Sequence, residues 1–336
     1  MAKVTVVDTS LRDGSHSVAH QFSTDDVRRI AKGLEDAGVD IIEVGHGDGL
    51  TGSTINYGYS KCSDFDLVQA ASSVLTNAKV AVLLIPGIGT VEDLEQIRDA
   101  GCSVVRVATH VTEADISAQH IEASKKMGFL TVGFLMMSHM ACVERVVEEA
   151  KKMESYGADL VYVTDSGGAM LNSDVVEKIG AVKEAVSIPV GHHAHHNLGL
   201  AVSNSIAAIR AGATYIDGSL GGLGAGAGNT PTEMLAAVMA KEKIESNLNL
   251  YKLLDVTEQE LVPVLSEYGV HLPINHDALM IGYAGVYSSF MLHARRAAER
   301  FNVDVRDILI ELGRIGAIGG QEDRIIDVAA GLAAKK

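Results

Sequence analysis

The sequence predicts an α/β protein folded as a TIM (β/α)8 barrel with a helical C-terminal extension. Three observations lead to this prediction. Eight short apolar runs alternate with longer amphipathic segments over about the first 240 residues, the usual size of such a barrel. A glycine recurs at the joint between a helical segment and the following run. After Glu245 the strand-like runs stop and the pattern becomes helical.

The eight runs are apolar at consecutive positions, which is typical of parallel strands covered on both faces. Amphipathic stretches such as 25–37 and 143–156 separate them and predict helices. The predicted strands are 3–7, 40–45, 79–85, 103–108, 129–137, 159–164, 188–195 and 214–219.

The glycine joints argue for one repeated unit. Glycine accepts the left-handed backbone that ends a helix, and it precedes the next run five times in the same phase. An open, doubly wound sheet would need a switch in strand order, which a sequence cannot show. Eight similar units therefore favour the barrel. The five glycines are Gly38, Gly101, Gly128, Gly157 and Gly212.

The C-terminal part lacks strand-like runs after Ser219, and we expect it to be helical. Helices are predicted at 250–268, 276–301, 305–313 and 322–334. A barrel does not need these helices to close. We therefore expect a catalytic barrel at 1–245 and a helical domain at 246–336 that serves partner or dimer contacts.

Composition excludes several classes of protein. The chain has 336 residues, 47% of them hydrophobic and 21% charged, which excludes a disordered protein. Its net charge of −15 argues against a general nucleic-acid binder. The three cysteines, Cys62, Cys102 and Cys142, form no CxxC pair and indicate reduced thiols in the cytoplasm. No signal peptide or membrane span is expected.

A candidate metal site lies in HHAHHN, at the end of the seventh run. In an extended segment alternate side chains share one side, so His193 and His195 face together. Asp13, after the neighbouring first strand, can supply a carboxylate. Two imidazoles and one carboxylate suit a divalent ion such as Mn²⁺, Mg²⁺, Fe²⁺ or Zn²⁺. Exposed histidines or a phosphate site are the alternatives, but four histidines in five positions at a strand end favour a metal.

The segment DTSLRDGSH places further polar groups beside this site. Arg12 offers a rigid fork of donors for a carboxylate or an enolate oxygen, whereas the alternative is a surface ion pair. His16 is a candidate general acid or base because its ordinary pKa is near neutrality. Taken alone, His16 is better explained as an ordinary loop histidine. Other polar residues at strand ends are Glu43, His46, Asp48, Asp165 and Ser166.

Two further motifs have simpler interpretations. The glycine-rich segment 221–233 lacks the lysine of a nucleotide-binding loop, so we expect a close backbone approach, with Asn229 or Thr230 capping the next helix. Tyr283 and Tyr287 are four residues apart, which predicts two packing residues on one helix face.

Taken together, several motifs resemble the 4-hydroxy-2-oxovalerate aldolase family, the pyruvate-specific class II aldolases of meta-cleavage aromatic and steroid degradation. The resemblance covers nearly the whole chain. Related synthases on the same barrel carry RDG-x-Q, whereas this chain has His16 at that position, which favours aldol chemistry. The motifs are DTSLRDGSH, VTDSGG, HHAHHNLGLA, GLGAGAGNTP, GYAGVYSSF and GGQEDRIIDVA.

The resemblance implies retro-aldol cleavage of 4-hydroxy-2-oxopentanoate to pyruvate and acetaldehyde. It implies Mn²⁺, with Mg²⁺ or Co²⁺ as alternatives, bound by Asp13, His193 and His195. Arg12 is implied to stabilise the enolate and His16 to act as the base. Tyr287 is implied to orient the substrate, with Tyr283 as its rival. The substrate-binding residues implied are Arg12, Asp13, Ser166, His193, Tyr287 and Leu83, of which Leu83 shapes the aldehyde pocket.

The resemblance also implies a partner, an acylating acetaldehyde dehydrogenase that receives the aldehyde through a channel. Two aldolase and two dehydrogenase chains are expected in the complex, with the C-terminal helices as the dock. One alternative is a Claisen-type synthase that uses acetyl-CoA, against which His16 argues. Another is a barrel kept as a non-enzymatic scaffold, against which the complete set of polar residues argues.

Overall fold

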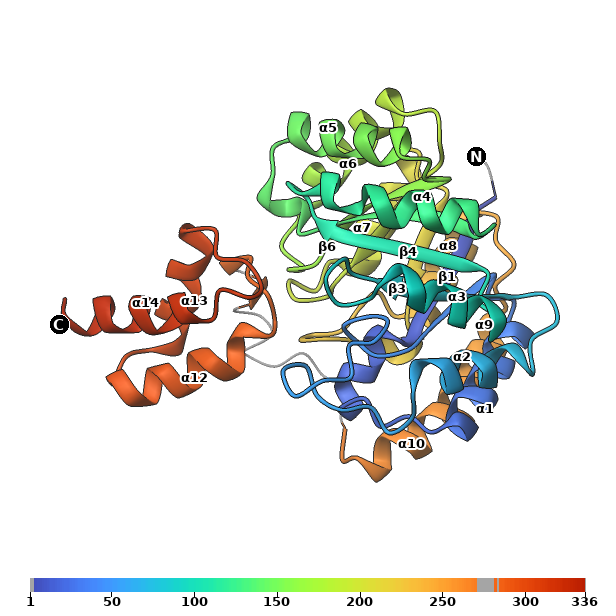
Figure 1. Ribbon diagram of the computed structural model, residues 1–336, viewed down its shortest axis with the longest axis horizontal. Coiled ribbons are helices and arrows are strands. Elements are labelled where there is room, and N and C mark those ends of the chain that lie inside the picture. The colour runs from blue at the N-terminus through green and yellow to red at the C-terminus, as the bar shows by residue number, and fades with distance from the viewer. Residues whose placement is uncertain (1–2, 271–280, 283, 336) are drawn as a thin grey trace.

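The computed structural model describes residues 3–270, 281, 282 and 284–335 (Figure 1). Eight parallel strands form a closed barrel in chain order, and β8 pairs with β1 to complete it. The predicted TIM barrel is therefore confirmed. The strands are β1 Thr5–Leu11, β2 Ile41–Val44, β3 Lys79–Leu84, β4 Val104–His110, β5 Leu130–Met136, β6 Leu160–Asp165, β7 Val190–Ala194 and β8 Tyr215–Gly218.

The first strand continues further than the sequence pattern predicts. Residues 8–11 were expected to follow β1, but they extend it to Leu11, which pairs with Val44 of β2. The register shifts between Asp8 and Leu11, so a bulge lets this polar segment remain in the barrel wall. As a result, Arg12 and Asp13 emerge directly at the strand end.

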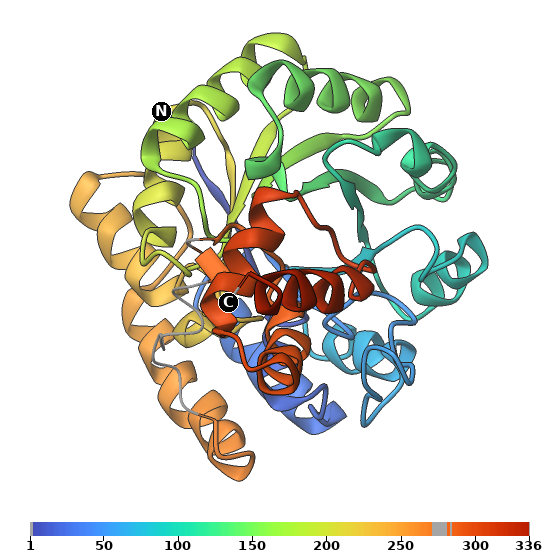
Figure 2. The same cartoon turned by 90° about the vertical axis from the view of Figure 1, so that its left-hand side faces the viewer.

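A ring of helices covers the outside of the barrel (Figure 2). Side-chain caps start several of them, such as Ser23 before the first helix and Thr90 before the third. The glycine joints adopt the expected left-handed backbone, with φ of 86° at Gly38. The helices are α1 Thr24–Asp36, α2 Asp64–Ser72, α3 Val91–Asp99, α4 Ala118–Lys126, α5 Val143–Ser155, α6 Asn172–Ala185, α7 Ala201–Arg210 and α8 Thr232–Glu242.

The barrel interior changes from apolar to polar toward the carboxyl ends of the strands. Val7, Ile41, Val104, Val132 and Leu160 belong to the interior apolar cluster. Two residues further along each strand, the alternation of side chains brings the next group into the interior. That layer contains Glu43, Arg106, Phe134, Tyr162, His193 and Asp217, all of them buried.

The C-terminal part divides into two regions. Helices α9 (Leu250–Val256) and α10 (Val262–Glu267), with a π-helical turn between them, lie beside the barrel, and α9 packs on α1. Helices α12 (Phe290–Phe301), α13 (Val305–Arg314) and α14 (Asp323–Ala333) share a separate apolar core. We call residues 284–335 the C-terminal lobe; it lies over one end of the barrel (Figures 1 and 2). The division at residues 245/246 stays a prediction.

One predicted helix is wrong in its described part. Residues 276–301 were expected to form a single helix, yet α12 begins only at Phe290. Gly285 has φ of 68°, and residues 285–289 lie outside regular helix, because this left-handed backbone ends the preceding turn. Tyr287 is therefore not on a helix face. Tyr283 and residues 271–280 lie outside the described residues.

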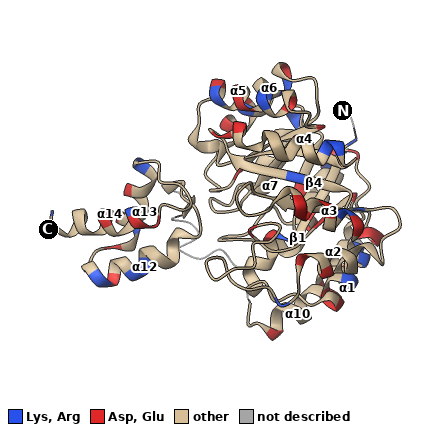
Figure 3. Ribbon diagram, viewed as in Figure 1, with Lys and Arg blue, Asp and Glu red and all other residues tan. Residues whose placement is uncertain are grey.

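The outer helices carry charged residues of both signs, as expected from a chain in which 21% of the residues are charged. In Figure 3, both acidic and basic residues are coloured on outer helices such as α1 and α5. Several form ion pairs within one helix, for example Lys32 with Asp36. Within the described residues, every helix is too short or too polar to cross a bilayer.

Asp8 links β1 to the start of α8. Its side chain is fully buried, accepting hydrogen bonds from the Ser10 backbone N–H and the Thr232 hydroxyl, each at 2.9 Å. Burial raises the pKa of Asp8 from 3.8 to about 7, although both hydrogen bonds oppose the shift. The folded protein therefore holds this proton more tightly than the unfolded chain does.

Asp8 should make the free energy of unfolding pH-dependent. Because its folded pKa is raised, its contribution to stability is complete below about pH 4 and is lost as the pH rises through about 7. At about 1.4 kcal/mol per pKa unit, the effect is a few kcal/mol. Asp8→Asn stays neutral and should remove this part of the slope. Urea unfolding of both proteins from pH 4 to 8 measures it; parallel pH profiles would contradict the assignment.

Candidate active site

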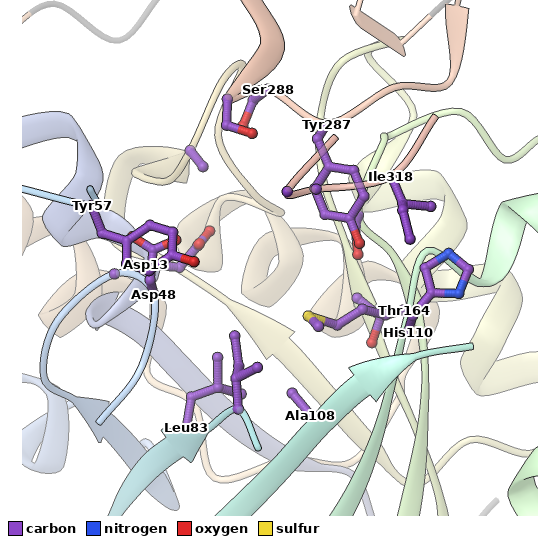
Figure 4. A pocket seen from close by; sticks show the side chains of 18 of the residues that line it. Asp13, Asp48, Tyr57, Leu83, Ala108, His110, Thr164, Tyr287, Ser288 and Ile318 are labelled. Carbon is purple, nitrogen blue, oxygen red and sulfur yellow. The ribbon is translucent and has the colours of Figure 1, made fainter. Parts of the chain in front are cut away.

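A cavity of about 710 Å³ lies between the carboxyl ends of the strands and the C-terminal lobe (Figure 4). All eight side chains that the sequence singled out for the site line it, although they come from four strand ends and the lobe. They are Arg12, Asp13, His16, Leu83, Ser166, His193, His195 and Tyr287.

Three of these side chains converge on one point. Donor atoms of Asp13, His193 and His195 all lie within 4.8 Å of one another. Nε2 of His195 is 3.9 Å from Oδ2 of Asp13, and the two imidazole rings are 5.1 Å apart. The alternation along β7 directs both imidazoles inward, and the bulged end of β1 presents the carboxylate.

The protonation states fit a divalent cation. Burial lowers the pKa of His195 to about 4, so its ring is neutral at pH 7. Burial alone would raise the pKa of Asp13, but Arg12 and the neighbouring histidines outweigh it and hold the pKa well below its usual range. A carboxylate and a neutral imidazole are the forms in which these two groups bind a metal ion. The trio therefore fits the ion that the sequence predicts.

Asn229 is a site residue that the sequence interpretation missed. It was expected to cap a helix, but Pro231 precedes α8, and Nδ2 of Asn229 donates to Oδ2 of Asp13 at 2.6 Å. Its Oδ1 is buried without a partner among the described residues. A Cβ on Gly224 would lie 2.8 Å from Oδ2 of Asp13, so the glycine-rich loop does approach closely, as predicted.

A second histidine cluster lies beside the first. Donor atoms of His16, His20 and Asp48 are also within 4.8 Å of one another. Nδ1 of His20, however, is 2.9 Å from the Ser15 hydroxyl. Burial lowers the pKa of His20 to about 3, with His16 adding to the effect. The His20 ring stacks on His46 at 3.7 Å and contacts His16 edgewise at 5.0 Å. We interpret this cluster as a support for His16, not a metal site.

Arg12 is fixed by three acceptors. Its Nε donates to Glu43 at 2.7 Å, and Nη1 donates to Asp13 at 2.9 Å and to the Gly47 carbonyl at 3.2 Å. Nη2 makes no hydrogen bond within the described part of the chain. Since Arg12 lines the cavity, Nη2 is available to an anionic oxygen.

A chain of buried ion pairs continues from Arg12 across the barrel. Glu43 lies 3.1 Å from Nη1 of Arg106, and Nη2 of Arg106 donates to Asp217 at 2.5 Å. Oδ2 of Asp217 is also 2.8 Å from Nδ1 of His193. Arg106 and Asp217 were not predicted, but each is a charged residue within an apolar run, which was the available signal.

The remaining predicted residues form the walls. The Ser166 hydroxyl accepts a hydrogen bond from the Met137 backbone N–H at 3.0 Å. Tyr287 enters from the lobe with its hydroxyl directed into the cavity, opposite an apolar floor that includes Leu83 and Ala108 (Figure 4). Burial raises the pKa of Tyr287, so its phenol stays protonated as a donor.

Comparison with known proteins agrees with this architecture. The HMGL-like family matches residues 3–259, and the DmpG-like communication domain matches residues 272–334. A 4-hydroxy-2-oxovalerate aldolase of Carboxydothermus hydrogenoformans is 58% identical and covers 97% of this chain and 96% of that protein. A 4-hydroxy-2-oxovalerate aldolase of Moorella thermoacetica is 55% identical over 99% of this chain and 98% of that protein.

Among solved structures, the carboxyl transferase domain of Rhizobium etli pyruvate carboxylase, with pyruvate and biocytin, has a TM-score of 0.82. The match covers 99% of this chain and 60% of the solved chain. At 15% sequence identity it shows the fold alone.

The fold and the matched families define the class: an HMGL-like TIM barrel followed by a DmpG-like communication domain. Within that class, the chain belongs to the 4-hydroxy-2-oxovalerate aldolase family, whose members are lyases. The recognition made from the sequence motifs is thereby confirmed.

Removal of a carboxylate should distinguish the two donor clusters. Asp13→Ala deletes one of three converging donors, so if they bind the ion, Mn²⁺ affinity should fall by more than the roughly 100-fold typical of outer-shell changes. Asp48→Asn changes an acid of the other cluster and should leave the affinity within about twofold. Calorimetric titration of chelator-treated protein measures both. The reverse ranking would move the metal to His16, His20 and Asp48.

Proposed function

We propose that this chain cleaves 4-hydroxy-2-oxopentanoate to pyruvate and acetaldehyde in a retro-aldol reaction that depends on a divalent ion, in meta-cleavage aromatic or steroid degradation. One observation carries the proposal: the Asp13, His193 and His195 cluster shares a cavity with Arg12 and His16. The names of the relatives support the choice of substrate.

Asp13, His193 and His195 would hold the cation, for which we propose Mn²⁺, with Mg²⁺ or Co²⁺ as alternatives. A divalent ion bound there would supply Lewis acidity to polarise the 2-keto oxygen of the substrate. His16 takes the proton from the C4 hydroxyl, directly or through water. The C3–C4 bond then breaks, acetaldehyde leaves, and the bonding electrons pass to the enolate of pyruvate.

Arg12 stabilises the charge that develops in this step. Its side chain is already held by Glu43 and Asp13, so little reorganisation is needed when the enolate oxygen becomes anionic. Protonation of the enolate carbon then gives pyruvate. Ser166 and Tyr287 contact and orient the substrate, while Leu83, on the apolar floor, shapes the aldehyde pocket.

A Claisen-type synthase that uses acetyl-CoA is the alternative. His16 argues against it, because related synthases carry glutamine at this position. The two reactions release different products. A synthase frees a thiol from acetyl-CoA when a 2-oxo acid is supplied, whereas the aldolase releases pyruvate from the hydroxy-oxo acid alone.

We further propose that the C-terminal lobe docks an acylating acetaldehyde dehydrogenase, in a complex of two chains of each kind. The match to a communication domain supports this partner. The lobe also contributes Tyr287, Ile318, Gly319 and Gly320 to the cavity wall, so the docking part and the active site share a boundary.

Pyruvate release, followed with lactate dehydrogenase, tests the activity. Chelation should abolish turnover and Mn²⁺ should restore it. His16→Ala should lower kcat by about 10²- to 10⁴-fold, because a positioned base is lost, while Mn²⁺ still binds. Covalent trapping by borohydride with substrate would contradict the scheme, since it would reveal a lysine Schiff base.

The docking proposal is tested with a matched pair of surface changes. Leu292 on α12 and Met234 on α8 are exposed to similar extents, 56% and 59%. Leu292→Arg places a charge on the lobe and should weaken co-purification with the dehydrogenase, whereas Met234→Arg, on the barrel, should not. Equal loss in both variants, or in neither, would place the contact elsewhere.

A further inference from the structure

We propose that Arg106 and Asp217 are positioning residues that set His193 for cation binding and, through Glu43, hold Arg12 in register with it. The proposal rests on the proposed function, because it assigns His193 to the cation. Neither residue lines the cavity, so both act through their neighbours. The argument rests on contacts between residues that are at most 3% exposed, apart from Arg12 at 5%.

Asp217 controls which nitrogen of His193 faces the site. Its Oδ2 is 2.8 Å from Nδ1 of His193, and a carboxylate can only accept there, so Nδ1 carries the hydrogen. In the neutral ring, Nε2 then carries the free lone pair that a metal ligand requires. The same hydrogen bond fixes the plane of the ring. A carboxylate behind a ligating histidine is a known way to raise its basicity and orient it.

Arg106 keeps that carboxylate in place. An isolated buried carboxylate is costly, and Nη2 of Arg106 donates to the same Oδ2 at 2.5 Å. On its other side, Nη1 of Arg106 lies 3.1 Å from Glu43, which itself accepts from Arg12. One guanidinium therefore holds the acceptors of both His193 and Arg12.

The surroundings of Arg106 favour arginine over lysine. Its Cζ lies 4.4 Å from the centre of the Phe134 ring and 4.6 Å from that of Tyr162, so the two rings restrict the guanidinium. A planar fork can serve two carboxylates at once from this position. An ammonium at the end of a flexible chain offers no such fixed geometry. Arg106 thus fixes the positions of Asp217 and Glu43, and through them the spacing between His193 and Arg12.

Two substitutions at Asp217 should form a graded series. Asp217→Asn keeps an acceptor for His193 but loses the charge, and the Mn²⁺ dissociation constant should rise about tenfold. Asp217→Ala also removes the acceptor, and the rise should approach about 100-fold. Calorimetry on chelator-treated full-length protein measures both. The visible absorption of the Co²⁺-loaded protein should shift as well, because it reports the ligand geometry directly.

Arg106→Lys provides a second test that keeps the charge. It should weaken Mn²⁺ binding in the same direction as Asp217→Asn, and should lower kcat more than it raises KM because Arg12 is displaced. If Asp217→Ala fails to fold, Asp217→Asn and Arg106→Lys still decide the question.

Glu149 supplies the matched control. It is a fully buried acid on the outer helix α5, paired with Arg145 at 2.7 Å and with Lys152 at 2.8 Å. Glu149→Gln and Glu149→Ala should lower the unfolding midpoint but leave Mn²⁺ affinity and the Co²⁺ spectrum unchanged. If the Asp217 variants behave in the same way, their role is structural and the proposal is overturned.

Failure of the proposed function has a different signature. If the wild-type protein neither binds Mn²⁺ nor releases pyruvate, the assignment of the site is wrong. If the wild-type protein does both while Asp217→Asn and Arg106→Lys retain its affinity within about twofold, only the positioning role is lost.

Discussion

A chain of buried, alternating charges across the barrel interior is the constraint on which the site depends. It links the two sides of the candidate metal cluster through side chains of β2, β4 and β8. Arg12, Glu43 and Arg106 each lie between two groups of opposite charge, which offsets the cost of removing them from water. The interior apolar cluster lies next to this chain of charges. The chain of ion pairs runs through Asp13, Arg12, Glu43, Arg106 and Asp217 and ends at His193.

The barrel could be predicted from the sequence because its strands are covered on both faces and read as apolar runs. Prediction from the hydrophobic pattern failed where that pattern does not match the local backbone. The end of β1 is polar yet stays in the barrel wall through a bulge, which no local pattern signals. Helix α12 begins late because Gly285 adopts a left-handed backbone within an otherwise helical pattern.

The site was predictable where one strand carries the pattern. His193 and His195 follow from alternation at the end of β7. Asp13 was expected on a strand adjacent to β7, but β8 lies between β7 and β1, and only the closed barrel brings Asp13 to the two histidines. The roles of Asp217 and Arg106 could not be predicted in this way, because their partners lie on other strands and meet them only inside a closed barrel. Asn229 was missed for a related reason: its local sequence is typical of a helix cap, while its amide reaches across to Asp13.

The lobe gives the cavity a roof that comes late in the chain. Tyr287 and Ile318 close over side chains that belong to the first strands. During synthesis, the barrel therefore completes its walls well before its active site is enclosed. A chain truncated after β8 would retain Arg12, His16 and the candidate metal-ligating trio but expose them to bulk water. Enclosure thus depends on the C-terminal lobe, so in the proposed reaction acetaldehyde would form in an enclosed cavity only in chains that already carry this lobe.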